Sequence, residues 1–390
     1  MRRTFRGKGG QNNRKPGKDK PLVLCLDAPP VSGFGFKVRS NCAMEIWFSM
    51  QTRREFAGSF RAIRQLSFGG TVFIIGLLLF NAPAEAQNVI PPDIVKLPAG
   101  IDLGNTSFYD GFGSTDPGWV FLNYSRWSNF TSIKDSSGKN SPLFVDPTID
   151  AISTVLHAVY VSPIRVPNGA ITFEVLLPIV DFQSRFNPLG AVLHNNGLNI
   201  GDVTFGSAYQ SKPITFGGQS VLSWRADLDF IAPTGGFDGN KDINQGSGFW
   251  SVNPSLAVSV LPVPKWEISA RFNYIYNLST SKGSDPPQIP GFEFRNGQAG
   301  QAGYINFASS YEVIKGVRPG LNGFWLHQFT NDSTNGVSLP GTRVDELYLG
   351  PGLSWEIDQK NTANFNVYLP ISVRNTSAGP QFNMQYIHPF

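Results

Sequence analysis

The sequence predicts an all-β protein, a transmembrane antiparallel up-and-down β-barrel of about twelve strands, with ten or fourteen strands as the alternatives. Three observations support this prediction. The composition is rich in Gly (41), Phe (31) and Pro (29) and only 15% charged, which favours a β protein with many turns over a helical bundle or a disordered chain. Strand-like segments alternate apolar and polar side chains, and the connections between them alternate between short and long.

The N-terminal part of the chain predicts export from the cytoplasm. An apolar run at residues 69–80 spans about a dozen residues, whereas a membrane-spanning helix needs about 20. Arginines precede this run, and Ala84-Glu85-Ala86 follows it as a small-x-small cleavage site. We therefore expect a signal peptide at residues 50–86, with Ala84 and Ala86 as the cleavage residues.

The rest of the chain divides into three further regions. Residues 1–49 are expected to be either an upstream extension that is not native to the protein or a disordered basic tail. Residues 87–116 are punctuated by Pro and Gly and lack periodicity, which predicts an irregular N-terminal segment folded against or into the barrel mouth. Residues 117–390 contain the strand-like segments and are expected to form the barrel.

The net charge of +4 belongs to the N-terminus. Residues 1–86 hold 14 of the 32 basic residues but only 5 of the 28 acidic ones, which leaves residues 87–390 with a net charge of −5. The acidic body argues against a nucleic-acid partner. Both cysteines, Cys25 and Cys42, precede the expected cleavage site, so the mature chain can form neither a disulfide nor a thiolate metal site.

The last residues predict the closing strand of a barrel. Phe382, Met384, Tyr386, His388 and Phe390 share one face, and the other face is mostly polar. A strand of this pattern that ends on an aromatic residue resembles the last strand of bacterial outer-membrane barrels. In those proteins the terminal Phe is an assembly signal, and we expect the same role for Phe390.

Twelve strand-like segments follow one another from residue 117 onward. Most have about the 9–11 residues that a tilted strand needs to cross the hydrocarbon layer. The segments lie at 118–128, 150–162, 170–180, 201–210, 221–232, 249–261, 266–277, 302–313, 320–329, 344–357, 362–373 and 381–390. The first, second and ninth segments alternate poorly, so the sequence defines their ends least well.

Alternation places charged side chains on one face of several segments. Arg225, Asp227 and Asp229 share one face of their segment, whereas Leu228 and Phe230 belong to the other. Alternating charges are costly in a packed core but suit a barrel interior whose opposite face meets lipid. They form either a polar path for a solute or an ion network that only holds the barrel. Parity gives eight candidate lumen-lining residues: Glu174, Arg225, Asp227, Asp229, Glu267, Arg271, Glu346 and Glu356.

The lengths of the connections orient the barrel. If the first strand starts in the periplasm, links after even-numbered strands should be short turns and links after odd-numbered strands should be long external loops. The short links are 163–169, 262–265, 314–319 and 358–361. The long links are 129–149, 181–200, 233–248, 278–301 and 330–343. Two links depart from the rule: 211–220 is longer than expected and 374–380 is shorter.

Three short motifs resemble a known family. They lie at 201–206 (GDVTFG), 226–235 (ADLDFIAPTG) and 253–256 (NPSL). Together they are similar to the "MetA-pathway of phenol degradation" family, outer-membrane barrels of Proteobacteria described as transporters, over residues 110–390. The resemblance implies a barrel in the outer membrane of a Gram-negative bacterium. The family name implies small aromatic or hydrophobic compounds as solutes, and no binding residues are carried over.

The sequence predicts no metal site, no cofactor and no catalytic residue. His157, His194, His327 and His388 are scattered without HxxxH or carboxylate spacing, which favours interfacial positions. His157 and Ser153 could belong to a lipase-like barrel enzyme, but no GxSxG element supports this. Residues 238–242 resemble a calcium-loop fragment without its Glu at position twelve, which predicts a solvated external loop.

The preferred function is passive transport or channel activity, and we expect the protein not to be an enzyme. One alternative is an outer-membrane hydrolase that acts on lipid. The other alternative is a structural or adhesive barrel with a closed lumen. The expected partners are outer-membrane lipids, the barrel-assembly machinery and a small-molecule solute, with no nucleic acid.

Overall fold

A computed structural model describes residues 91–390. The expectations for residues 1–49, for the signal peptide at 50–86 and for its cleavage residues Ala84 and Ala86 lie outside the described residues. The described part contains strands and loops, and none of its segments is a helix that is long and apolar enough to cross a membrane.

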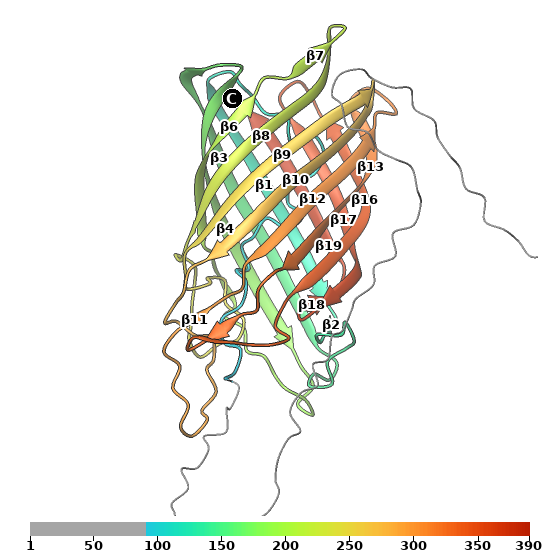
Figure 1. The fold of residues 1–390 in the computed structure, drawn as a ribbon. Helices are drawn as coiled ribbons and strands as arrows, with labels where there is room; N and C mark the ends of the chain where they lie inside the picture. Colours follow the sequence, from blue (N-terminus) through green and yellow to red (C-terminus); the bar gives the residue numbers. More distant parts are fainter. Residues whose placement is uncertain (1–90) are drawn as a thin grey trace, which may run out of the picture. The chain divides into compact units, whose positions relative to one another are not determined.

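Twelve long strands form a closed antiparallel barrel (Figure 1). They are β1 (Gly118–Phe130), β3 (Thr148–Val166), β4 (Gly169–Arg185), β6 (Val203–Ser211), β8 (Gln219–Ala232), β9 (Ser251–Val263), β10 (Trp266–Asn277), β12 (Ala302–Tyr311), β13 (Val317–Gln328), β16 (Asp345–Glu356), β17 (Thr362–Arg374) and β19 (Gln381–Pro389). Each strand pairs with its neighbours in sequence order, and β19 pairs with β1 to close the barrel. The predicted fold class and the count of twelve strands are confirmed.

Seven short strands belong to the connections. They are β2 (Ser132–Ile133), β5 (Leu198–Ile200), β7 (Ile214–Phe216), β11 (Gly297–Gln298), β14 (Ser333–Thr334), β15 (Val337–Ser338) and β18 (Ser377–Ala378). β7 explains the link after the fourth strand that was longer than expected, because it pairs with the start of β8 across Gly217 and Gly218. Both glycines have positive φ angles, 58° and 80°, as a two-residue hairpin turn of type I′ requires.

Some strand ends differ from the prediction. β3 continues to Val166 and β4 to Arg185, beyond the predicted ends near residues 162 and 180. The two strands pair along almost their whole length, with Thr148 opposite Arg185. The alternation of apolar and polar side chains fades where a strand extends beyond the membrane on either side, because both of its faces then meet water. Backbone pairing continues there, so the sequence pattern ends before the strand does.

The outer surface of the barrel is apolar over the height of a bilayer. Leu228, Leu256 and Phe272 are exposed on it at mid-height, on three consecutive strands. Aromatic side chains border this apolar surface near both ends, with Trp119, Trp266 and Trp355 at the end with short turns. An apolar surface between two aromatic girdles is what a lipid bilayer requires.

The end with long connections is the extracellular side in barrels of this kind, and the end with short turns is periplasmic. In Figure 1 the C-terminus and β7 mark the periplasmic end, and β11 marks the opposite, extracellular end. Phe390 lies at the periplasmic end, where its backbone N–H donates to the carbonyl of Trp119 (2.9 Å) and its ring is 75% exposed.

Deleting Phe390 is expected to reduce the amount of inserted barrel several-fold. The backbone of Phe390 extends the seam between β19 and β1, and its exposed ring remains free for recognition during assembly. The amount of heat-modifiable barrel in outer-membrane fractions, measured by gel electrophoresis, tests this. Phe390→Tyr keeps an aromatic end and is expected to assemble normally. Wild-type levels of the deleted protein would refute the role in assembly.

The described part of the N-terminal segment, residues 91–117, passes through the barrel from one end to the other. Pro92 begins among the external loops, where its carbonyl accepts a hydrogen bond from Thr334 Oγ1 (2.9 Å). Gly104 lies inside the barrel, where its carbonyl accepts from Tyr368 Oη (2.8 Å) and Asn383 Nδ2 (3.0 Å). The chain leaves the lumen at the periplasmic end, where Gly118 starts β1. The lumen is therefore partly filled by the protein's own chain.

Candidate lumen site

An arginine clamp holds the middle of the N-terminal segment. Arg271 of β10 donates from Nε and Nη2 to the two carboxylate oxygens of Asp110, both at 2.8 Å. Arg225 of β8 donates to the Asp110 carboxylate (3.2 Å) and to its backbone carbonyl (3.0 Å). Arg271 also pairs with Asp102 (3.4 Å). The bidentate geometry fixes both position and orientation, so Asp110 is the main electrostatic anchor of the segment.

Neutral contacts add to this clamp. Gly104 N–H donates to Asn306 Oδ1 and Gly111 N–H donates to Ser259 Oγ, both at 2.8 Å. At Gly111 the backbone lies directly on β8 and β9, because an added Cβ would come within 2.5 Å of the Ser259 nitrogen. Leu103 packs on a buried aromatic cluster that includes Phe324. These contacts involve the strands from β8 to β19.

The segment leaves space in front of the opposite wall of the lumen, which is formed by β1, β3 and β4. It contacts this wall through Arg126 of β1, whose Nη2 donates to the Leu103 carbonyl (2.5 Å). Two cavities lie between this wall and the segment. The external cavity has a volume of about 420 Å³ and is lined by residues 96–103 of the segment, by the external halves of the three strands and by residues of other strands, among them Asp229 and Glu346. The periplasmic cavity has a volume of about 450 Å³ and is lined by residues 107–114, by the periplasmic halves of the three strands and by residues of β16, β17 and β19.

The two cavities meet at four residues that line both of them: Tyr124, His157, Glu174 and Arg271, which we call the belt. His157 is buried, and its Nε2 lies 2.8 Å from Glu174 Oε2. Its Nδ1 lies 3.2 Å from the Tyr124 hydroxyl. Arg271 faces these three residues from the side of the segment, where Asp110 and Asp102 hold it. A solute that moves from one cavity to the other has to pass the belt.

The wall on either side of the belt is largely apolar. Val155, Leu176 and Val180 line the external cavity, and Leu122, Val159 and Val161 line the periplasmic one. The strands that hold the segment face the lumen mostly with buried Asn, Ser and Gln side chains instead. The apolar lining explains the poor alternation of the first two strands, because both of their faces carry apolar residues.

The structure places the eight candidate lumen-lining residues on the inside of the barrel. Glu174 belongs to the belt, and Arg225 and Arg271 belong to the clamp. Asp227 pairs with Arg225 (2.8 Å), and Asp229 lines the external cavity. Glu346 and Glu356 line the external and the periplasmic cavity, respectively. Glu267 is fully buried, where it accepts hydrogen bonds from Tyr109 N–H (3.0 Å) and Ser310 (2.7 Å). The set therefore contains both cavity-lining and purely structural charges.

The interfacial position predicted for the histidines is wrong for His157. Its side chain points into the lumen, and the charged partner of its Nε2 is Glu174 rather than a serine-based catalytic pair. Tyr124, Asp102 and Asp110 were not predicted from the sequence. For the first two strands a signal was present: Tyr124 and His157 are polar residues on inner faces that are otherwise largely apolar, and such an exception marks the belt.

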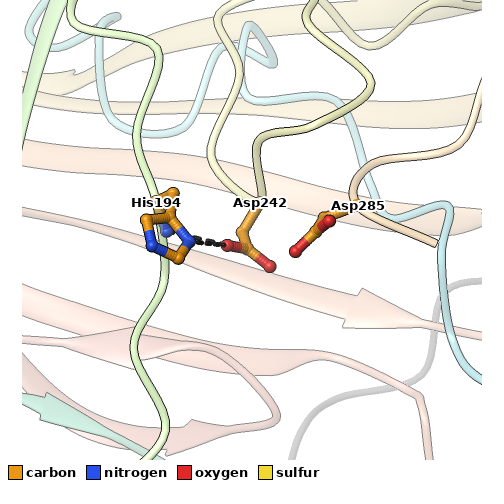
Figure 2. A group of neighbouring side chains, drawn as sticks. All are labelled: His194, Asp242 and Asp285. Carbon is orange, nitrogen blue, oxygen red and sulfur yellow. Dashed lines mark hydrogen bonds and ion pairs between the residues drawn. The ribbon is translucent and has the colours of Figure 1, made fainter. Parts of the chain in front are cut away.

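Three possible metal ligands lie together on the external loops, although their sequence spacing gave no sign of it. His194 Nδ1 lies 3.5 Å from Asp242 Oδ2, and Asp285 lies on the other side of Asp242 (Figure 2). Ligand atoms of all three residues lie within 4.8 Å of one another. His194 and Asp285 are exposed, so water competes for them, and three ligands of this kind do not complete a coordination shell.

A buried acidic pair lies where the N-terminal segment enters the barrel. Asp332 is 2% exposed and accepts hydrogen bonds from Gly300 N–H (2.6 Å) and Gln328 Nε2 (2.8 Å). Burial, followed by the nearby charge of Asp93, raises the pKa of Asp332 to about 7. Burial also raises the pKa of Asp93. Asp332 in the folded protein therefore holds a proton that the unfolded chain releases at lower pH.

Stability is expected to fall as the pH rises from the pKa of Asp332 in the unfolded chain to its higher pKa in the folded protein. The folded state binds more protons than the unfolded state in this interval, so deprotonation favours unfolding. The melting temperature of the wild-type barrel should decrease from about pH 4 to about pH 7, and Asp332→Asn should flatten this dependence. Asp358→Asn, a change at an exposed periplasmic turn, is the control. An identical slope in wild type and Asp332→Asn would contradict the assignment.

The comparisons with known proteins agree with this architecture. A crystal structure of the COG4313 outer membrane channel from Pseudomonas putida F1 is similar, with a TM-score of 0.60 and 15% sequence identity, over 72% of this chain and 98% of that chain. The beta domain of the Bordetella autotransporter BrkA is less similar, with a TM-score of 0.43 and 10% identity, over 70% of this chain and all of that domain. At 15% identity, the likeness to the COG4313 channel establishes the fold alone, which is that of an outer-membrane barrel.

Sequence comparison identifies the family. No curated protein matches the chain. A family model described as "Putative MetA-pathway of phenol degradation" matches residues 131–386, about two thirds of the sequence and nearly the whole barrel. The match confirms the resemblance that the short motifs indicated. The chain belongs to the MetA-pathway of phenol degradation family of outer-membrane β-barrels.

Proposed function

We propose that this protein is an outer-membrane channel for small, largely apolar molecules, and that solutes move between the N-terminal segment and the wall formed by β1, β3 and β4. The observation that supports this most directly is the pair of cavities on this wall, which meet at the belt. Each cavity is large enough for a single-ring molecule. The COG4313 protein, which is similar in fold, is itself described as an outer membrane channel.

The apolar lining favours such solutes over sugars or inorganic ions. A sugar that leaves water needs a partner for each hydroxyl group, and the valines and leucines of this wall offer none. An apolar molecule loses little when it leaves water for the same surface. The family description, which refers to phenol degradation, is consistent with small aromatic compounds.

Single-channel recording in planar lipid bilayers tests the proposal. The purified barrel is expected to conduct small ions at a low level, because the segment occupies part of the lumen. Addition of a small apolar solute should then block this current reversibly. A barrel that never conducts would support the alternative of a structural or adhesive protein with a closed lumen.

The hydrolase alternative has a separate test. The only charged partner of His157 within the described residues is Glu174, and the geometry supports a polar contact with solute better than a nucleophile and base. Replacement of His157, His194, His327 and His388 together should leave conduction of the barrel measurable. Lipid hydrolysis by the wild type that disappears in this variant would favour the enzyme.

A further inference from the structure

On the wall side of the belt, formed by Tyr124, His157 and Glu174, the unused hydrogen-bonding groups are acceptors. An ionised Glu174 can only accept hydrogen bonds, so the 2.8 Å contact requires the proton of His157 on Nε2. In the neutral imidazole, Nδ1 is then an acceptor, and the Tyr124 hydroxyl donates its single proton to it across 3.2 Å. The hydrogen bonds therefore run in one direction, from Tyr124 to His157 to Glu174. The remaining lone pairs of the Tyr124 and Glu174 oxygens are all acceptors.

A second acceptor lies next to Glu174. Asp229 is 8% exposed and lines the external cavity, and its Oδ1 is buried without a hydrogen-bond partner. On the barrel wall Gly206 pairs with Glu174 on one side and with Asp229 on the other. Because Gly206 has no side chain, the two carboxylates can approach each other across it. A buried acceptor without a partner is costly, and a bound donor would remove this cost.

Most of the donor capacity on the opposite side is already engaged. Each of the three nitrogens of Arg271 donates to Asp110 or Asp102, which uses three of its five N–H groups and holds the guanidinium toward the segment. A solute in the belt therefore meets acceptors on the wall. Arg126, two residues beyond Tyr124 on β1, lines the external cavity, where it donates to the Leu103 carbonyl of the segment and its buried Nε has no hydrogen-bond partner. A carboxylate in the belt would lie close to the ionised Glu174, and like charges in a poorly hydrated site repel strongly.

We propose that Tyr124, His157, Glu174 and Asp229 form a binding site for the hydroxyl or ammonium group of a small, otherwise apolar molecule, and that the site rejects carboxylates. This proposal rests on the passage proposed above, because the belt is the point that every solute must cross. The recognised chemistry is a hydrogen-bond donor on an apolar body. The site thus selects by functional group, and the cavities select by size.

Ligand binding to the full barrel in detergent tests this without any need for transport. Benzyl alcohol, benzylamine and benzoate share one ring and one extra carbon but differ in the polar group. Isothermal titration calorimetry or ligand-observed NMR is expected to detect saturable binding of the alcohol and the amine. Benzoate should bind about tenfold more weakly or not at all. Comparison of the alcohol with the amine shows whether the donor alone or also its positive charge is recognised.

Two variants and a matched control locate the site. Glu174→Gln should weaken benzylamine binding about tenfold and reduce the discrimination against benzoate. Tyr124→Phe removes only a hydroxyl group and should weaken benzyl alcohol binding while it leaves all charges in place. Glu293→Gln removes a carboxylate from an exposed external loop, outside both cavities, and should leave both affinities nearly unchanged. Heat-modifiable migration on gels shows that each variant is folded.

The outcomes separate the two proposals. Equal binding of benzoate and benzyl alcohol by the wild type, or equal effects of Glu174→Gln and Glu293→Gln, would overturn the binding site. Absence of binding for all three probes would overturn it as well, even if the barrel conducts. A barrel that binds the alcohol or the amine but never conducts would overturn the channel and leave the site intact.

Discussion

A barrel without residues 91–113, with the preceding residues joined directly to the residues before β1, is expected to conduct several-fold more current than the full chain. These residues fill the side of the lumen opposite the β1–β3–β4 wall, and removing them would join the two cavities into one open passage. Water would then replace Asp110 as the partner of Arg225 and Arg271. Single-channel conductance in planar bilayers measures the change, and the barrel strands themselves remain complete.

Asp110→Ala tests the same restriction of the current with a single substitution. It breaks the anchor but keeps the chain in the lumen, so we expect an intermediate conductance with frequent fluctuations. Asp135→Ala, on an exposed external loop, is the control and should conduct like the wild type. Equal conductance in the full chain, the deletion and Asp110→Ala would show that the segment does not restrict the passage.

Leu228→Arg and Phe272→Arg are expected to lower the amount of folded barrel strongly. Both side chains face outward, with exposed fractions of 43% and 49%, and Phe272 lies between Leu256 and Ile305 on the neighbouring strands. An arginine at this depth on the lipid face costs about 2–4 kcal/mol. Because folded barrels are only marginally stable, one such change shifts the balance between insertion and degradation.

Leu228→Met and Phe272→Leu keep an apolar surface and serve as controls for the loss of the native side chain. Denaturant titration of refolded barrels in lipid vesicles would measure the free energy of unfolding, and gel mobility would measure insertion in cells. Stability equal to wild type in both arginine variants would mean that these positions do not face lipid. Asp227→Asn, at the neighbouring inward position, should assemble in either case.

The inner and outer faces of most strands could be predicted from single residues. In β8 the alternation of Arg225, Asp227 and Asp229 with Leu228 and Phe230 matches their observed positions on the two faces. Such predictions succeed because each face of a transmembrane strand meets one uniform environment, lipid or lumen, over its whole length. The alternation fails where the lumen itself changes character. In β13, Phe324 and Leu326 face inward to pack on the N-terminal segment.

The candidate site could be predicted only in part. Glu174, Arg225 and Arg271 were identified because charge on an inner face is a local signal. Asp110 was missed because its segment has no periodicity, and its arginine partners lie 115 and 161 residues away in sequence. The position of His157 was predicted wrongly because metal and catalytic sites were judged from residue spacings along the chain. The partners of His157, Tyr124 and Glu174, lie on the two neighbouring strands.

The sequence by itself predicted the barrel, its number of about twelve strands and the face to which most side chains belong. These properties follow from period-two alternation and from loop length, and both are local in the chain. Only the tertiary structure decided that the N-terminal segment occupies the lumen, and where the two cavities and the belt lie. These features arise when the sheet closes, because closure brings Gly104 next to Asn383, 279 residues away, and leaves one wall of the lumen unfilled.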